Sequence, residues 1–475
     1  MFDRRLFVHF EGSYIRFLDD ALGYPSYAVQ FDPYKGPSGN RSTTRSAGVF
    51  GNFNYSWDNR YLVDITGRLD GSSNFASNQR SAPFWSVGVR WNIYNESFMR
   101  SHGIFENLAI RANIGTVGNS NFQLSQIMTL YNYMKMYDGV MGAEIMSIAN
   151  RKLKWQTTTN RNIGLEFSML KGLMNFDFNF YSNTTNNNLT DIAILPSTGF
   201  TTYKANMGKV RNQGLEFALS VTPVRTKDWR VNVFVNGARN KNKLLSISDA
   251  LKDYNETVKE NQTTGTGKTK LERVFMFEEG KSLNSIYAVR SAGIDPGTGQ
   301  EVFMTVDGER TFTWNSADQV VVGNTEPDLK GFFGVNVDYK RWSLGMNLQY
   351  SFGADKYNKT LYEKIEGGDF SQNMDRRALK GRWTQPGDIA RYKGYSNLAQ
   401  LKPTSRFVQK DNFLSMTSLR LTYTLNDRDI DFLGLSLLKV SLSTNDLFYV
   451  STIKQERGLN YPFARTFYLS IQANF

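Results

Sequence analysis

Apolar and polar residues alternate along most of this chain, down to its last residue. Phe467, Leu469, Ile471, Ala473 and Phe475 are separated by Tyr468, Ser470, Gln472 and Asn474. A period of two predicts a β-strand with two unlike faces. Chain ends usually fray, so a regular strand that reaches the last residue indicates that this end is held in a sheet. A strand in lipid must pair on both sides, and we expect this strand to do so.

The same alternation recurs through the sequence. In residues 84–93, Val87, Val89 and Trp91 alternate with Arg90 and Asn92. Tyrosine, phenylalanine and β-branched residues in such runs favour strands. The pattern predicts 14 strands, an even number, at residues 6–15, 46–57, 60–70, 84–93, 108–114, 161–169, 174–184, 207–221, 230–238, 330–339, 342–351, 412–425, 435–445 and 467–475.

The connections between these segments alternate between short and long. Asp58-Asn59, Lys171-Gly172 and Lys340-Arg341 are tight turns, whereas residues 17–45, 118–159, 241–328 and 353–410 are long excursions. Transmembrane barrels have short periplasmic turns and long outer loops. The sequence therefore predicts an all-β, antiparallel transmembrane β-barrel. The region 241–328 would be an extracellular loop, with a short helix near Ser248–Lys252 and a hairpin around Glu301–Gly308.

Other β architectures share a period of two. A soluble β-sandwich or solenoid is compatible with the periodicity, but the alternation of connection lengths disfavours both. Aromatic residues near strand ends also favour a membrane barrel, whose girdles lie at the two interfaces. In this chain such residues include Trp57, Tyr61, Trp91, Tyr181, Trp342 and Tyr350.

Composition adds to this picture. The mean hydropathy of -0.44 suits a barrel, because half of each strand faces a wet interior. The chain has no apolar run long enough for a transmembrane helix. It also has 0 cysteines, which excludes disulfides and thiol chemistry. The net charge of +12 would attract anionic lipid or substrate. We favour the simpler interpretation that basic residues gather at turns and loops.

The sequence offers little catalytic or cofactor chemistry. His9 and His102 are far apart and lack the spacing of metal ligands. Gly265–Thr269 resembles the end of a phosphate-binding loop, but the position of its first glycine is Gln262. No stripe of basic and aromatic residues suggests nucleic-acid binding. We expect no enzyme activity, no catalytic or metal site and no cofactor.

Eight segments in family order resemble one class of protein. They are residues 68–75 (RLDGSSNF), 83–88 (PFWSVG), 114–119 (IGTVGN), 153–160 (LKWQTTTN), 206–216 (NMGKVRNQGLE), 292–300 (AGIDPGTGQ), 383–388 (WTQPGD) and 457–465 (RGLNYPFAR). Together they resemble the C-terminal barrel of the SusC/RagA-type TonB-dependent outer-membrane transporters, over about residues 46–475.

That resemblance implies a function and several partners. Such transporters form barrels of about 22 strands, filled by an N-terminal plug and energised through a TonB-box. A SusD-type surface lipoprotein covers them, and they import oligosaccharides or peptides. Residues 1–475 show no plug, TonB-box or signal peptide, so we expect a C-terminal fragment that is barrel throughout. Its expected partners are outer-membrane lipid, the SusD-like lipoprotein, the missing plug and, through it, the TonB complex.

Residues of the polar strand faces are candidates for the lumen wall. There they would hydrogen-bond the plug and the substrate path, or simply solvate the wall. They are Asp64, Arg68, Arg90, Arg111, Asp177, Asn179, Asn232, Asp338, Asn347, Arg420 and Asn474. Loop aromatics could stack on sugar faces, or pack the loops against one another or against the lid. These are Tyr254, Trp314 and Tyr395.

Three functions follow from these observations. The first is part of an outer-membrane nutrient importer, which depends on detergent and pairs with missing strands. The second is a self-closing passive pore of the same 14 strands, which conducts ions without a plug. The third is a secreted, β-rich carbohydrate-binding protein, which is soluble without detergent. The resemblance favours the first and disfavours the third.

Overall fold

The structure is a computed structural model of the chain. It describes residues 2–11, 14–17, 28–31, 38–73, 80–100, 103–119, 130–137, 140–147, 150, 154–193, 202–249, 251–253, 255–256, 276–368, 371, 373–395, 401–425, 434–454 and 464–474.

One antiparallel sheet dominates the molecule. It has 15 strands, and all but one of them form a single path. In order these are β1 (Phe2–Glu11), β4 (Ser38–Trp57), β5 (Tyr61–Ser72), β6 (Ser81–Asn92), β7 (Phe105–Asn119), β10 (Gln156–Met169), β11 (Met174–Ala193), β12 (Thr202–Arg225), β13 (Trp229–Ile247), β18 (Leu329–Tyr339), β19 (Trp342–Tyr357), β20 (Val408–Leu425), β21 (Leu437–Thr444) and β23 (Phe467–Asn474). The remaining strand, β22 (Tyr449–Ser451), pairs with β20.

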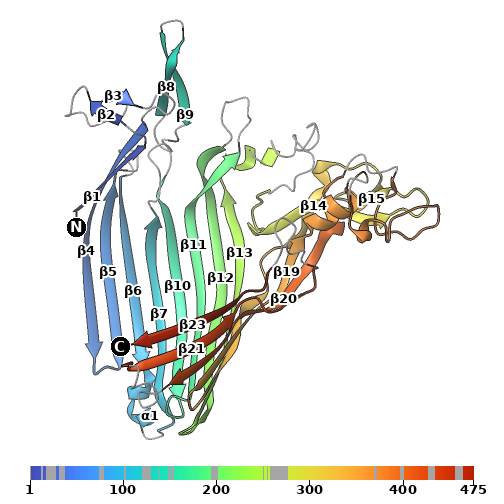
Figure 1. Cartoon of the computed structure of the whole chain (residues 1–475). Helices are drawn as coiled ribbons and strands as arrows, with labels where there is room; N and C mark the ends of the chain where they lie inside the picture. Colours follow the sequence, from blue (N-terminus) through green and yellow to red (C-terminus); the bar gives the residue numbers. More distant parts are fainter. Residues whose placement is uncertain are drawn as a thin grey trace.

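Figure 1 shows this sheet as a curved wall, with β21 and β23 crossing in front of it. Two hairpins lie outside the sheet: β2 (Tyr14–Phe17) with β3 (Ala28–Phe31), and β8 (Leu130–Tyr137) with β9 (Val140–Ser147). A short connection after β6 contains η3 (Ile93–Asn95) and α1 (Ser97–Arg100). None of the helices in the described ranges is both long and apolar enough to span a membrane.

Every predicted strand overlaps a strand of the path, but the boundaries differ. β12 begins at Thr202, and β13 continues to Ile247, into the predicted excursion 241–328. The ladder continues there although both faces are polar, as in Asn240-Lys241-Asn242. Periodicity cannot detect a strand without an apolar face. The last strand also differs from expectation, because among the described residues β23 pairs only with β21.

The register separates the sheet into two faces. Asp64 of β5 lies opposite Gly88 of β6, which lies opposite Asn113 of β7. One residue along, Val63 lies opposite Val89. We call these the polar face and the apolar face. Large side chains of the apolar face stay exposed, among them Val89 at 47%. An extended exposed apolar surface marks an interface, and the expected barrel would place lipid against it.

Aromatic pairs of the apolar face border the short turns. Their ring centroids are 5.8 Å apart for Trp57–Tyr61, 6.4 Å for Tyr61–Trp91, 4.3 Å for Trp229–Tyr339 and 4.7 Å for Trp342–Tyr423. This row is typical of an interfacial girdle. Tyr181 was wrongly grouped with it: it lies on the polar face, where its hydroxyl donates to Asn240 Oδ1 at 2.9 Å.

Two excursions that the sequence left as separate loops pack together. The first contains β14 (Ser285–Ile294), β15 (Glu301–Met304), β16 (Arg310–Thr311), η7 (Ser316–Asp318) and β17 (Gln319–Asn324); the second contains η8 (Thr360–Glu366), η9 (Arg376–Ala378) and η11 (Ser405–Phe407). We call residues 276–328 with 358–407 the loop module. It lies beside β19 and β20 at one end of the wall (Figure 1).

The loop module has a hydrophobic core of its own. Ile286 of the first excursion packs with Leu361, Ile365 and Phe407 of the second and with Tyr357 at the end of β19. The expected hairpin near 301–308 is confirmed by the pairing of β15 with β16. The expected helical turn near residue 248 is also confirmed, because the amides of Leu251 and Lys252 donate to the Ser248 carbonyl.

Candidate functional site

Four charged side chains form a chain across the polar face. Arg90 on β6 and Arg111 on β7 both bind Glu166 on β10, and the Arg111–Glu166 distance is 3.1 Å. Arg111 also reaches Asp177 on β11, at 2.9 Å. Asn107 donates to Glu166 at 3.0 Å. The two positive and two negative charges balance, which is the favourable arrangement for partly desolvated charges.

A glycine allows this network to cross the sheet. Gly164 of β10 lies opposite Arg111, between the strands of Arg111 and Asp177. A Cβ atom at Gly164 would lie 2.6 Å from Arg111 Nε. The absence of that atom lets the guanidinium lie over β10 and contact the carboxylate two strands away.

Replacing Gly164 by Val is expected to push Arg111 away from Asp177. Overpacking of this kind destabilises by about 1–3 kcal/mol. The free energy of unfolding in detergent or vesicles would measure it. Gly67→Val is the matched control, because a Cβ atom there would have nothing within 4 Å. Equal losses of unfolding free energy in Gly164→Val and Gly67→Val would contradict the close contact between position 164 and Arg111.

The other predicted wall residues lie on the same face. Arg68 pairs with Asp70 at 2.6 Å, and Asn347 donates to Ser418 Oγ at 2.8 Å. Asp64 is exposed, as is Arg420, which lies opposite Gly345. Two of the remaining residues make hydrogen bonds: Asn232 donates to Ser220 at 2.9 Å, and Asp338 accepts from Ser343 at 2.7 Å. The other two belong to the polar face by their register, since Asn179 lies opposite Gly164 and Asn474 lies opposite Leu437 on β21.

Sequence reasoning missed the central residue of the network. Glu166 joins both arginines, yet only Arg90, Arg111 and Asp177 were singled out. Its signal was present, since Glu166 stands between Leu165 and Phe167 in an alternating strand. The sequence does not show the register that brings the charges of four strands together.

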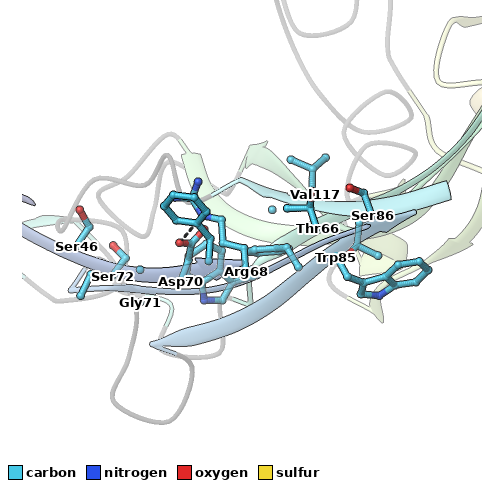
Figure 2. A pocket seen from close by; sticks show the side chains of 16 residues that line it. Ser46, Thr66, Arg68, Asp70, Gly71, Ser72, Trp85, Ser86 and Val117 are labelled. Atoms are coloured by element: carbon cyan, nitrogen blue, oxygen red, sulfur yellow. Dashed lines mark hydrogen bonds and ion pairs between the residues drawn. The ribbon is translucent and has the colours of Figure 1, made fainter. Parts of the chain in front are cut away.

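A cleft of about 590 Å³ opens over β4 to β7, away from the ion network, and Figure 2 shows it from close by. The Arg68–Asp70 pair lies in it, and the hydroxyl side chains of Thr66 and Ser86 lie together on one side of that pair. Its remaining lining residues are Ser46, Ala47, Gly48, Phe50, Gly71, Ser72, Phe84, Trp85, Thr116, Val117, Gly118 and Trp155. Such a cleft can hydrogen-bond a polar ligand and contact it with aromatic rings.

The loop module is fixed to the polar face at its base. Glu326 accepts from Asn240 of β13 and from Asn284 of the module. Asn242 of β13 accepts from the amide of Leu283 at 2.8 Å. These bonds join the module to the side of the sheet that carries the ion network.

The loop aromatics differ in their surroundings. Trp314 donates to the Pro403 carbonyl at 3.4 Å, and Lys402 Nζ lies 4.8 Å from its ring. It therefore joins the two excursions. Tyr395 is 46% exposed, with the Arg382 guanidinium 5.1 Å from its ring. Tyr254 lies outside the described residues.

A buried ionic cluster holds the loop module together. Arg406 binds Glu301 at 2.7 Å and Glu366 at 2.8 Å, and both carboxylate side chains are 1% exposed. Lys393 lies 3.4 Å from Glu301. Arg382 donates to the carbonyls of Ala378, Ile365, Glu366 and Lys393. Burial by itself would raise the pKa of Glu301, but Arg406 and Lys393 outweigh it and lower that pKa.

Acid is expected to loosen the loop module. Because the pKa of Glu301 is lowered on folding, its stabilisation is fully present above its unfolded pKa of about 4.3. It is lost as the pH falls through the lowered folded value. Hydrogen exchange of the module at pH 7 and at about pH 3 would show this loss. Glu301→Gln should flatten the pH dependence, and an unchanged profile in that variant would contradict the assignment.

The described part of the chain was expected to hold no metal site. Those residues contain no group of three or more His, Asp or Glu side chains that could hold an ion. His102 lies outside the described residues, and the side chain of His9 is not described.

Comparison with known proteins agrees with this architecture. Residues 3–274 match the family described as TonB dependent receptor-like, beta-barrel. A TonB-dependent receptor of Formosa agariphila is 25% identical over 468 residues, which cover 86% of this chain and 43% of that protein. The TonB-dependent receptor SusC of Bacteroides thetaiotaomicron is 27% identical over 368 residues, covering 75% of this chain and 36% of that protein.

Solved structures show the same fold. The structure of the RagAB peptide transporter superimposes with a TM-score of 0.77 at 23% identity, covering 95% of this chain and 49% of that chain. The RagAB peptide importer in its closed-closed state gives a TM-score of 0.79 over 100% of this chain and 52% of that chain. The chain thus spans about half the length, or less, of these relatives.

The family match covers more than half of the chain, and an antiparallel wall with one polar and one apolar face accompanies it. The chain belongs to the TonB-dependent receptor β-barrel family of outer-membrane proteins, and its relatives are of the SusC/RagA type.

Proposed function

We propose that this chain forms the wall and extracellular loops of a TonB-dependent importer of oligosaccharides or peptides. The observation that carries the proposal is the two-faced sheet. Its exposed apolar face suits lipid, and its opposite face carries a balanced ion network, amides and hydroxyls. Such a polar face fits a water-filled path for a polar solute.

The proposal extends to the polar residues singled out from the sequence. Arg68, Arg90, Arg111 and Asp177 would line the lumen with Glu166, and Asp64, Asn347 and Arg420 would continue the lining on neighbouring strands. The region 241–328, together with the second excursion, would lie on the extracellular side. Tyr395 is the better candidate for substrate contact, because Trp314 already packs the module.

We further propose that the barrel is completed by strands outside this sheet. Among the described strands β1 pairs only with β4 and β23 only with β21, which leaves one edge of each open. Unpaired backbone groups are very costly in lipid, so both edges need partners. In this proposal the chain works with a plug, the TonB complex and a SusD-like surface lipoprotein.

Uptake by intact cells tests the function. Deleting the coding region of residues 1–475 should abolish uptake of labelled oligosaccharides or peptides of a defined size. In the undeleted strain an uncoupler should also abolish it, because TonB coupling needs an energised inner membrane. Uptake that persists with the uncoupler, together with ion conductance in planar bilayers, would favour the passive pore. Recovery of the chain in the culture medium would favour a secreted binding protein.

A further inference from the structure

The connection between β6 and β7 is unlike most turns at its end of the sheet. It runs over residues 93–104 and contains η3 and α1, whereas β18 and β19 are joined by two residues, 340 and 341. Figure 1 places α1 beyond the ends of the strands. Closing a hairpin does not require a connection this long and partly helical, so a second role is expected for it.

Glu96 fixes this connection on the apolar face. Its Oε1 accepts from the Tyr61 hydroxyl at 2.8 Å and from Trp91 Nε1 at 3.0 Å, and its Oε2 accepts from Arg60 at 3.3 Å. Tyr61 and Trp91 belong to the aromatic row of the apolar face. Glu96 is only 7% exposed, so three donors hold the carboxylate against the side of the sheet that meets lipid.

The short helix is tied to the same position. The Glu96 carbonyl accepts from the amides of Met99 and Arg100 at 3.0 and 3.1 Å. Asn95 donates to the Asn59 carbonyl of the neighbouring turn at 2.9 Å. The connection therefore has a fixed height along the sheet, level with the aromatic row.

Apolar side chains of this connection are left at the surface. Phe98 is 56% exposed and Ile104 is 47% exposed. Trp57 in the adjoining row is 59% exposed. Phe98 and Ile104 belong to the connection that Glu96 holds on the apolar face, so the same solvent is expected to cover the connection and that face.

The charges of this region suit the headgroup zone rather than the hydrocarbon. Hydrogen bonds from Trp91 and Tyr61, more than the charge of Arg60, lower the pKa of Glu96. An ionised carboxylate is expensive in the bilayer core but not among headgroups. Asp58, Arg60, Glu96 and Arg100 together carry no net charge, so the contact needs no anionic lipid.

We propose that the β6–β7 connection is a lipid-contacting element, with Phe98 and Ile104 among the phospholipid headgroups and upper acyl chains of the periplasmic leaflet. The inference rests on the proposed function, in which the apolar face meets lipid. Aromatic side chains are favoured at this depth because the ring is apolar and the zone is partly wet. The partner is a zwitterionic phospholipid surface.

The absence of cysteine makes a depth measurement straightforward, because the chain has 0 cysteines. Phe98→Cys would be labelled with a fluorophore and the chain reconstituted, together with the strands that complete its barrel, in phosphatidylcholine vesicles. Nitroxide lipids would quench at a shallow or a deep position, and iodide would quench from water. Ile163→Cys, 58% exposed on the apolar face, marks the hydrocarbon; Ile389→Cys, 97% exposed in the loop module, marks water.

The label at position 98 should be quenched about twofold more by the shallow than by the deep nitroxide, and several-fold less by iodide than the label at 389. Iodide quenching equal to that at 389, with position 163 still quenched by the deep nitroxide, would overturn this inference and leave the membrane wall intact. Loss of lipid quenching at 163 would overturn the wall, and this inference with it.

A second variant tests the attachment. Glu96→Ala removes the acceptor of three bonds and should make the label at 98 several-fold more accessible to iodide. Glu106→Ala is the matched control, since Glu106 binds the amides of Lys171 and Gly172 in the neighbouring turn. Equal accessibility in both variants would show that Glu96 does not hold the connection at the membrane.

Discussion

Arg406→Met is expected to unfold the loop module while leaving the sheet folded. The substitution leaves Glu301 and Glu366 as buried carboxylates, each 1% exposed, without their main partner. Removing one partner of a buried ion pair costs about 3–5 kcal/mol. That loss corresponds to at least a hundredfold faster exchange of the amides that the module protects, at about 1.4 kcal/mol per factor of ten.

Hydrogen exchange with mass spectrometry would separate the two regions. Peptides from β14, η8 and η11 should lose protection, and peptides from β10 to β13 should not. Arg377→Gln is the control, because Arg377 pairs with Asp375 nearer the surface, with side chains 26% and 33% exposed. Exposed pairs contribute about 0–1 kcal/mol. Exchange in Arg406→Met that matches this control would refute the role of the cluster.

Adding Glu301→Gln and Glu366→Gln to Arg406→Met should restore part of the protection. The amides are neutral, so no uncompensated carboxylate is buried in that triple variant, and only Lys393 loses an ionised partner. If the triple variant were no better protected than Arg406→Met, the loss would come from packing of the arginine stem rather than from its charge.

Phe84→Ala is expected to destabilise the sheet by about 3 kcal/mol, at the lower end of the range for buried aromatic residues. The Phe84 side chain is 8% exposed and packs against Trp155, 7% exposed, with ring centroids 5.7 Å apart. The ring also lies over Gly118, where a Cβ atom would be 2.0 Å from Phe84 Cζ. Truncation leaves a cavity beside the cleft of Figure 2.

Phe50→Ala provides the matched comparison, because Phe50 lines the same cleft but is 66% exposed. Its loss should change the free energy of unfolding by about 0.5 kcal/mol or less. Denaturant titration of the reconstituted chain, read from the folded band in electrophoresis without heating, would measure both variants. Similar midpoints for Phe84→Ala and Phe50→Ala would contradict the packing of Phe84 against Trp155.

Local patterns predicted the strands because each has one apolar face. The alternation of Phe176, Phe178 and Phe180 with Asn175 and Asp177 needs no knowledge of the neighbouring strands. Periodicity did not predict the strand where its apolar face ends, as in the part of β13 after Ala238, although backbone pairing continues there.

The candidate site could be predicted only in part. Membership of the polar face follows from periodicity, so Arg90, Arg111 and Asp177 were identified correctly as residues of that face. Their convergence on Glu166 depends on the register of four strands and on the missing side chain of Gly164. Neither is a property of any one segment.

The loop module shows the same limit more strongly. Arg406 lies 105 residues from Glu301 and 40 residues from Glu366, and each of the three looks like an ordinary surface charge in the sequence. The sequence by itself determined the strands, their two faces and the family, because these depend on local alternation and on short motifs. Only the tertiary structure decided which charges meet, since long-range contacts arise from register and packing that no local pattern encodes.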